Sequence, residues 1–399
     1  MKISQSVKKA IYIGTLCAVS YLAVYIARNI LSTVSPQMIG DGSLNTENIG
    51  TLSSLYFGFY AVGQLINGII GDKIKPKFMM GFGLVLAGVC NFAFPILIKS
   101  LLAVYTAYAL SGFFLSMIYG PMTKVISENV EPQHAPRCSV ANAFTALFGS
   151  PAAGVIAAMF VWQTVFKITG GLLVLMGVAC FVFFKIFEKK GIVKYGQFSL
   201  PKGQKGSVKV LFKHKIIKFT LISVVTGVVR TTVVFWLPTY LSQHLKFSEK
   251  TAALLFTVST LVISLSAFVS VAVYELFKRD MEKTALWAFV ASSGCFAMML
   301  VANNAAVNII FMVLAILTAN IASTMLWSFY CPSLRDTGMV SSATGFLDFM
   351  SYMAASVSSK IFANAVGVIG WGGLIAVWCA LMVVGVVISL PFKKIKKVK

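Results

Sequence analysis

Charged side chains are scarce in this sequence of 399 residues, because Asp, Glu, Lys and Arg together make up only 12% of it. An ordinary soluble domain carries about 25% charged residues. A larger core does not explain the deficit, since a soluble protein of this size must still cover itself with polar surface. With 58% of the residues hydrophobic, the scarcity of charge excludes a soluble domain and indicates an exterior that faces lipid.

Acidic residues are scarcer still, with 12 Asp and Glu against 34 Lys and Arg and a net charge of +22. Such a balance can mark a nucleic-acid-binding protein. Here, however, the basic residues lie in short clusters between apolar runs, and no soluble basic domain carries them. We therefore predict no nucleic-acid partner, and we assign the basic clusters to loops beside a lipid bilayer.

Residues that carry catalytic or metal chemistry are also few. The seven cysteines form no CxxC pair, and most fall in apolar runs, where cysteine behaves as a small hydrophobe. The three histidines, His134, His214 and His244, fall in predicted loops. The apolar runs contain no set of nucleophile, base and acid. We therefore predict no disulfide, no metal site, no cofactor and no enzyme activity.

Long apolar runs are what the sequence has in abundance. A helix needs about 20 residues to cross a hydrocarbon layer of about 30 Å. We predict twelve spans, at 10–34, 49–71, 78–98, 101–122, 138–160, 163–187, 216–241, 250–275, 284–302, 304–330, 339–366 and 368–391. The first exceeds the about 7–15 apolar residues of a signal peptide, so we expect it to be retained as a helix.

One long polar segment, residues 188–215, divides these spans six and six and holds eight lysines. The expected organisation is an N-terminal half at 1–187, a basic cytoplasmic linker at 188–215 and a C-terminal half with a basic tail at 216–399. Placing the N-terminus in the cytoplasm puts 27 of the 34 basic residues inside and four outside. The positive-inside rule then predicts a plasma (inner) membrane protein with both termini cytoplasmic.

An internal repeat is the second organising signal. Arg28 and Arg230 are 202 residues apart, and each is followed eight residues later by a proline. Glu47 and Glu249 repeat the offset of 202 residues. The agreement indicates two duplicated halves, an architecture in which transporters bind substrate between the halves at mid-membrane depth. Because one chain then encloses a complete site, we expect it to function as a monomer.

The loop that runs from Gly68 through Asp72 and Lys73 to Lys77 resembles the signature between helices two and three of the major facilitator superfamily. The resemblance implies a cytoplasmic gate, in which Asp72 pairs with basic residues and latches one conformation. An ordinary positive-inside loop is the alternative.

The two arginines are the candidate binding residues. A cation inside a membrane helix costs at least about 2.5–3.5 kcal/mol, so its presence indicates function. Arginine does not release its proton, and its planar fork suits phosphate or carboxylate. Tyr21 and Tyr25 share a helix face with Arg28 and can donate hydroxyls to the same oxyanion. The alternatives are arginines neutralised by carbonyls or a buried acid, and tyrosines that only pack.

Around these arginines the chain resembles the organophosphate:phosphate antiporters. The resemblance is carried by Tyr21-x3-Tyr25-x2-Arg28-Asn29, by Arg230-x5-Trp236-Leu237-Pro238, and by Thr344-Gly345-Phe346 with Gly370-Trp371. It implies a twelve-helix major-facilitator bundle and a two-arginine anion site with Trp236 as a further substrate-binding residue. It also implies exchange against inorganic phosphate and alternating access by rocking of the halves.

Three positions depart from that family's pattern. Gln64 stands where the family usually has a lysine in the cavity, and Thr145 and Phe148 are the best match to its helix-five histidine. The site therefore keeps two arginines but loses two accessory cationic groups. We predict a changed or less highly charged substrate, with Gln64 among the binding residues.

Asp348 stands where the family usually has a small residue, and it is the one carboxylate well inside a predicted span. It can pair with an arginine, bind a cationic part of the substrate or carry a proton, or it can simply pack in its helix. Lys360 lies twelve residues on, about 18 Å along the axis, which is too far for a direct pair with Asp348.

We therefore predict a secondary transporter of a small anionic, phosphorylated metabolite that exchanges for inorganic phosphate, with Arg28 and Arg230 as the anion clamp. A proton-coupled symporter of an organic anion, with Asp348 as its proton site, is one alternative. A transporter-like sensor that binds ligand without moving it is another, although no signalling domain supports it.

Overall fold

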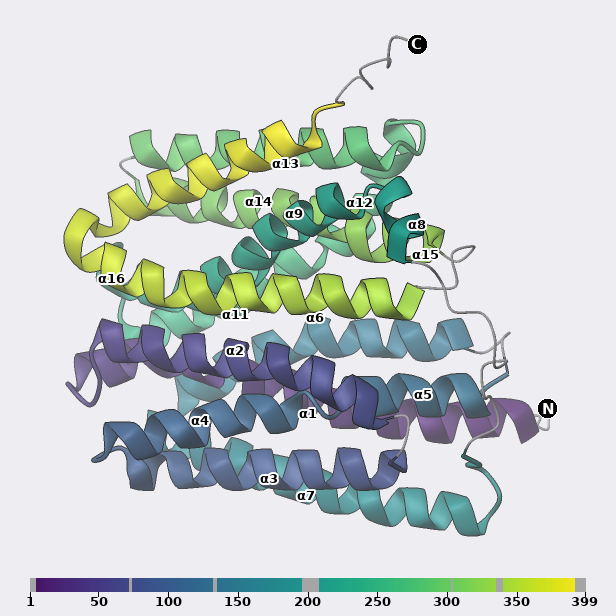
Figure 1. The fold of residues 1–399 in the computed structure, drawn as a ribbon. Helices are drawn as coiled ribbons and strands as arrows, with labels where there is room; N and C mark the ends of the chain where they lie inside the picture. Colours follow the sequence, from purple (N-terminus) through teal and green to yellow (C-terminus); the bar gives the residue numbers. More distant parts are fainter. Residues whose placement is uncertain are drawn as a thin grey trace, which may run out of the picture. The chain divides into compact units, whose positions relative to one another are not determined.

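The computed structural model describes residues 5–71, 74–131, 135–195, 208–302, 304–334 and 340–391, and over these ranges the chain is helical without a strand. The first seven helices run alongside one another (Figure 1). They are α1 (Gln5–Gly40), α2 (Thr46–Gly71), α3 (Pro76–Leu97), α4 (Leu101–Leu115), α5 (Tyr119–Asn129), α6 (Ala135–Met159) and α7 (Trp162–Lys189). The predicted span 101–122 is divided between α4 and α5, which are separated by three residues.

The later elements are more broken. They are α8 (Val208–Lys213), α9 (Ile216–Gly227), the π-helix η1 (Val228–Val233), α10 (Val234–Gln243), α11 (Glu249–Ser264), α12 (Ser266–Leu276), α13 (Met281–Val301), α14 (Ala305–Thr324), the π-helix η2 (Met325–Tyr330), α15 (Cys331–Ser333) and α16 (Val340–Ser389). The last contains a break at Gly370, whose φ of +66° is left-handed and suits a residue without a side chain.

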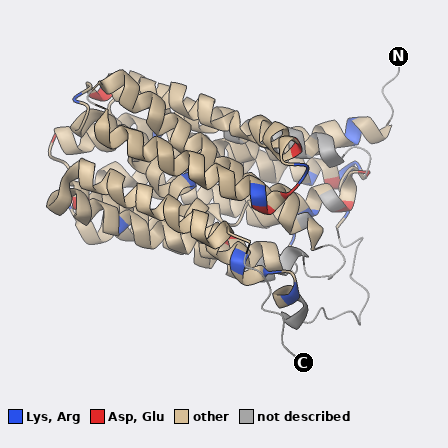
Figure 2. Ribbon diagram, turned by 90° about the horizontal axis from the view of Figure 1, so that it is seen from above, with Lys and Arg blue, Asp and Glu red and all other residues tan. Residues whose placement is uncertain are grey.

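The predicted spans correspond to apolar helical segments of the described chain. Ten segments are long and apolar enough to cross a membrane, and the last of them joins two helices across the break at Gly370. The predicted span 138–160 lies in α6, where the apolar part is the shorter Leu147–Met159. Charged residues gather at the helix ends and are rare along their middles (Figure 2). The chain is an integral membrane protein with an all-α, twelve-helix fold.

Two compact units divide the chain. The first contains 1–204, 235–261 and 355–364, and the second contains 205–234, 262–354 and 365–399. The division after residue 204 falls inside the predicted linker 188–215. Two later segments nevertheless belong to the first unit, so its boundaries do not follow the sequence halves. The predicted halves at 1–187 and 216–399 stay a prediction.

Glycines bring α3 and α7 together in the first unit. A Cβ atom on Gly88 would lie 2.7 Å from the carbonyl oxygen of Gly170, and one on Gly177 would lie 2.8 Å from that of Gly81. The pairs 81/88 and 170/177 each have a seven-residue spacing, so both lie on one helix stripe. This close approach explains why glycine recurs in the apolar runs.

Candidate functional site

Arg28 lies on α1 of the first unit, against two aromatic rings of α2. Its guanidinium carbon is 5.8 Å from the centroid of the Phe57 ring and 5.7 Å from that of Tyr60. A ring face attracts the cation and leaves the N–H donors at the guanidinium edge to hydrogen-bond an acceptor. The two rings therefore stabilise the Arg28 cation on its helix, and its role in binding an oxyanion stays a prediction.

The two predicted tyrosines lie one and two turns before Arg28 on the same helix. The rings of Tyr21 and Tyr25 make an edge contact at 5.2 Å, and Tyr21 also contacts Tyr119 of α5 at 5.6 Å. Both tyrosines are partly exposed. This cluster continues from Arg28 along α1, and its role as a set of hydroxyl donors to the substrate stays a prediction.

Arg230 occupies an equivalent setting in the second unit. Its guanidinium carbon is 5.8 Å from the ring of Trp327 on η2 and 5.7 Å from the ring of Tyr352 on α16. Its Nε and Nη2 atoms are buried and find no hydrogen-bond acceptor among the described residues. A buried donor without an acceptor costs free energy that a bound oxyanion would recover.

The helical segments that carry Arg230 and its ring partner Trp327 are both π-helices. Arg230 lies in η1 and Trp327 in η2, each a stretch of six residues. A π-helical turn inserts an extra residue into an α-helix, so it redirects the side chains that follow, and such turns occur frequently at functional sites. No pattern in the apolar runs marks these positions.

Asp348 meets Arg230 inside the second unit. Its Oδ1 atom is 3.9 Å from Nη2 of Arg230, which is an ion pair but too long for a hydrogen bond. The two side chains are 27% and 30% exposed. Asp348 thus lies in ion-pair range of an arginine, and its predicted roles in substrate binding and proton transfer stay predictions.

The remaining predicted site residues lie on α2, α6 and α10. Trp236 is completely buried in α10, where it contacts Phe235 and lies beside Gly50 of α2. Gln64 is partly exposed on α2, Thr145 is buried and Phe148 is 53% exposed. Trp236 thus lies in the core of the first unit in this conformation, and the binding roles of Trp236 and Gln64 stay predictions.

Lys360 and the histidines are not among the predicted binding residues. Lys360 is exposed on α16. His214 and His244 lie in loops, as predicted, while His134 lies outside the described residues.

The ring partners of the two arginines were not predicted as such. Phe57, Tyr60 and Trp327 lie in the spans 49–71 and 304–330 among many other aromatic residues. Tyr352 lies in the span 339–366, four residues after Asp348. Nothing local in the sequence distinguishes a ring that contacts an arginine from one that packs in the core.

The predicted cytoplasmic gate is only partly described. Asp72 and Lys73 lie outside the described residues, and of Gly68 only the helical backbone is described. Lys77 forms an ion pair with Glu188 at the end of α7. The ammonium group of Lys75 is 5.9 Å from the ring of Tyr195.

Tyr195 lies at the start of the predicted linker. Burial and then the Glu188 carboxylate raise the pKa of Tyr195 above its usual value, so its hydroxyl stays protonated. The lysines of the predicted gate loop, Lys75 and Lys77, therefore contact the end of α7 and the residues that follow it.

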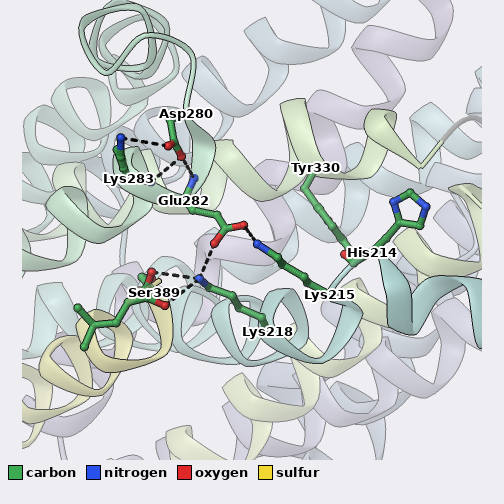
Figure 3. Close-up of polar contacts among 9 residues, drawn as sticks. His214, Lys215, Lys218, Asp280, Glu282, Lys283, Tyr330 and Ser389 are labelled. Atoms are coloured by element: carbon green, nitrogen blue, oxygen red, sulfur yellow. Dashed lines mark hydrogen bonds and ion pairs between the residues drawn. The ribbon is translucent and has the colours of Figure 1, made fainter. Parts of the chain in front are cut away.

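A second polar cluster joins helix ends of the second unit (Figure 3). Glu282 of α13 pairs with Lys215 and with Lys218, and Lys218 also donates to the carbonyls of Ser389 and Leu390 at 3.0 and 3.2 Å. These bonds satisfy the last carbonyls of α16, which have no partner within the helix. The cluster therefore ties α16 to α9 and α13.

The C-terminal residue of η2, Tyr330, is held by two contacts. Tyr330 donates a hydrogen bond from its hydroxyl to the carbonyl of His214 at 3.0 Å (Figure 3). Its ring also stacks on Phe219 at 3.6 Å. Because Trp327 lies on the same π-helical segment, this anchor positions the ring that contacts Arg230.

A row of hydroxyl contacts, hereafter the hydroxyl seam, joins early and late helices within the first unit. Ser32 donates to the carbonyl of Phe235 at 2.6 Å, and Ser35 lies 2.7 Å from the hydroxyl of Thr239. On the neighbouring pair of helices, the hydroxyl groups of Ser53 and Ser359 are 2.9 Å apart. The seam therefore ties α1 to α10 and α2 to α16.

Residues 17–359 match the family model described as Major Facilitator Superfamily. Curated relatives match over shorter stretches. A membrane sensor protein UhpC of Salmonella typhimurium is 32% identical over 94 residues, which are 24% of this chain and 21% of the sensor. A phosphoglycerate transporter protein of the same organism is 32% identical over 105 residues, covering 25% and 22% of the two chains.

A probable hexose phosphate transport protein of Chlamydia pneumoniae is 21% identical over 109 residues, which are 27% of this chain and 24% of the relative. These matches thus span only about a quarter of the relatives' length.

Solved structures share the fold over almost the whole chain. A bacterial homologue of the human lysosomal transporter Spinster, inward-facing and unoccupied, superposes with a TM-score of 0.75 at 14% identity and covers 96% of this chain and 93% of its own. A D-xylose-proton symporter gives a TM-score of 0.72 at 12% identity over 97% and 98% of the two chains. At such identities the likeness concerns the fold alone.

Proposed function

The chain belongs to the Major Facilitator Superfamily, a family of transporters and not of enzymes, and on this premise we propose that it moves a small phosphorylated metabolite across the membrane by alternating access. Arg28 and Arg230 bind the anionic group, and inorganic phosphate is the exchange partner. The chain acts as a monomer in the plasma (inner) membrane with both termini in the cytoplasm.

The observation that carries this proposal is the setting of Arg230. Two nitrogen atoms of its guanidinium are buried without a hydrogen-bond acceptor in the described chain, and the guanidinium carbon lies 5.8 and 5.7 Å from the rings of Trp327 and Tyr352. An oxyanion satisfies such a fork with two parallel bonds. Arg28, at the repeat-related position, has the same kind of aromatic support.

The partial relatives support the phosphorylated class of substrate. Their printed names refer to hexose phosphate and to phosphoglycerate. Both compounds join a phosphate dianion to a small polar body. Gln64, in the place of a lysine, leaves the site with less positive charge, so we expect the smaller or less highly charged members of this class.

Uptake into proteoliposomes tests the proposal. Vesicles that contain the purified chain are preloaded with phosphate and offered labelled glucose 6-phosphate or 3-phosphoglycerate. We expect uptake that depends on internal phosphate and persists when a protonophore collapses the proton gradient, because arginine carries no proton. Uptake that the protonophore abolishes and that ignores internal phosphate would instead establish a proton symporter, with Asp348 as the first candidate for its proton site.

A sensor is the second candidate, because one of the partial relatives is a membrane sensor. A sensor would bind a phosphorylated ligand without moving it. Binding of glucose 6-phosphate to the purified protein, together with no uptake in either vesicle assay, would favour this function over transport.

A further inference from the structure

We propose that Asp348 is an internal counter-ion of Arg230, which lets the carrier return across the membrane without a bound anion and so permits net uptake as well as exchange. The inference rests on the proposed transport function and adds to it a mode that a two-arginine exchanger lacks.

The distance between Asp348 and Arg230 is long enough for a substrate anion to separate the two side chains. The 3.9 Å between Oδ1 of Asp348 and Nη2 of Arg230 provides electrostatic attraction but no hydrogen bond. An oxyanion at the guanidinium edge forms charge-assisted bonds of about 2.7–2.9 Å. A substrate anion therefore makes closer contacts with Arg230 than Asp348 does, and it replaces the carboxylate as the principal partner of the arginine.

The backbone around Asp348 is fixed on both sides. The preceding residue, Leu347, accepts a hydrogen bond from Ser223 of α9 at 2.7 Å. Three residues after Asp348, Ser351 lies against Gly227, where an added Cβ would be 2.3 Å from the serine hydroxyl. Because α9 continues directly into η1, these contacts set α16 in register with the turn that carries Arg230. The carboxylate is thus held beside the arginine by the packing of two helices.

Both members of the pair belong to the second compact unit. Both residues also lie in the predicted C-terminal half, 216–399. A counter-ion within one half travels with its arginine, whereas one in the other half would be lost when the halves rock during alternating access. The pair therefore stays together while the carrier is empty, and this is what the return of an empty carrier needs.

The consequence follows from the cost of unpaired charge. An arginine without anion or acid, closed into a low-dielectric interior, is strongly disfavoured, so the empty carrier does not reorient and only exchange is observed. The Asp348 carboxylate removes that penalty at Arg230, which is one of the two cations of the proposed site. The empty carrier then returns, and labelled anion accumulates in vesicles that contain no exchange partner.

The test compares two transport modes with one probe, labelled inorganic phosphate. Proteoliposomes contain either no internal anion substrate, for net uptake, or unlabelled phosphate, for exchange, and a potassium–valinomycin clamp holds the membrane potential at zero. We expect the wild type to show both modes. Asp348→Asn should lower net uptake about tenfold or more, while exchange falls by less than about threefold.

Two variants control for trivial effects. Asp348→Glu keeps the charge and should retain net uptake, and Lys360→Gln removes an exposed charge from the same helix and should change neither mode. Equal loss of both modes in Asp348→Asn, no loss of either, or a wild type that exchanges without net uptake would each overturn the proposal.

Thermal unfolding of the purified proteins provides a readout that does not need transport. The counter-ion role predicts that Asp348→Asn has a lower apparent Tm without anion, and that adding Arg230→Gln, which removes the lone charge, restores part of the loss. An unchanged Tm, or no restoration, overturns it. If the wild type moves no phosphate in either mode, the proposed function has failed, and these Tm values alone decide the role of Asp348.

Discussion

At the scale of single residues, two arginines are each held between aromatic rings. Arg28 lies against Phe57 and Tyr60, and Arg230 lies against Trp327 and Tyr352. Such rings offset part of the cost of placing a cation in a membrane helix. Arg230 also has the carboxylate of Asp348 as an ion-pair partner at 3.9 Å.

The first prediction concerns the guanidinium forks. Arg28→Lys and Arg230→Lys keep the charge but lose the planar bidentate geometry. Each should lower phosphate exchange in proteoliposomes about 10- to 100-fold, which is the rate equivalent of one or two charge-assisted hydrogen bonds. Size-exclusion profiles like those of the wild type would show that folding is intact. Full exchange by either variant would remove that arginine from the substrate site.

At the scale of elements, two features shape the helices. One is close helix packing at glycines, and the other is the π-helical turn, which contains an extra residue. The α3–α7 contact depends on glycines that let backbones approach to within van der Waals distance. The segments η1 and η2 instead widen the helix and redirect Arg230 and Trp327. The first feature lets helices pack closely, and the second sets the direction of Arg230, which is proposed to bind the anion.

The second prediction tests the glycine contact. Gly88→Val places methyl groups against the Gly170 carbonyl oxygen, 2.7 Å from the position of the new Cβ, and should destabilise the fold by about 1–3 kcal/mol. The apparent Tm in detergent should fall, and the monodisperse yield with it. Gly171→Ala is the matched control, because a Cβ there meets no atom within 4 Å. Equal Tm values for both variants would contradict the close packing of α3 on α7.

At the scale of the whole molecule, the hydroxyl seam ties together helices from distant parts of the sequence. The bonds between Ser35 and Thr239 and between Ser53 and Ser359 span more than 200 residues of chain. Hydroxyl pairs bond with modest net energy and exchange readily for water, so they suit a contact that must open repeatedly. The proposed alternating access requires this seam to separate during part of the cycle, because the seam joins helices of the two predicted sequence halves.

The third prediction tests that separation. The hydroxyl oxygens of Ser35 and Thr239 are 2.7 Å apart, so sulfur atoms there approach the disulfide length of about 2.05 Å. Oxidation of the Ser35→Cys/Thr239→Cys double variant should stop exchange, and a reductant should restore it. The single variants and the wild type, with its seven free cysteines, control for other oxidation. Exchange at full rate by quantitatively cross-linked protein would show that α1 and α10 stay together during transport.

Much of the molecule could be predicted from local patterns. The scarcity of charge and the apolar runs indicated a membrane protein, and run length fixed the spans, because a bilayer sets the length of a helix. The family followed from the motifs around Arg28 and Arg230, and the fold agrees with it. The break between the last two spans fell near Gly370, where a glycine permits the left-handed backbone.

The site required the tertiary structure. Arg230 and Asp348 are separated by 118 residues, so no helical spacing relates them, and only the packing of α16 on α9 brings them to 3.9 Å. The rings of Phe57, Tyr60 and Trp327 are ordinary aromatic residues until a helix crossing places them against a cation. Sequence by itself determined which residues enter the membrane, because that depends on local hydropathy. The tertiary structure decided which of them meet, because contacts between helices depend on the register and crossing of whole elements.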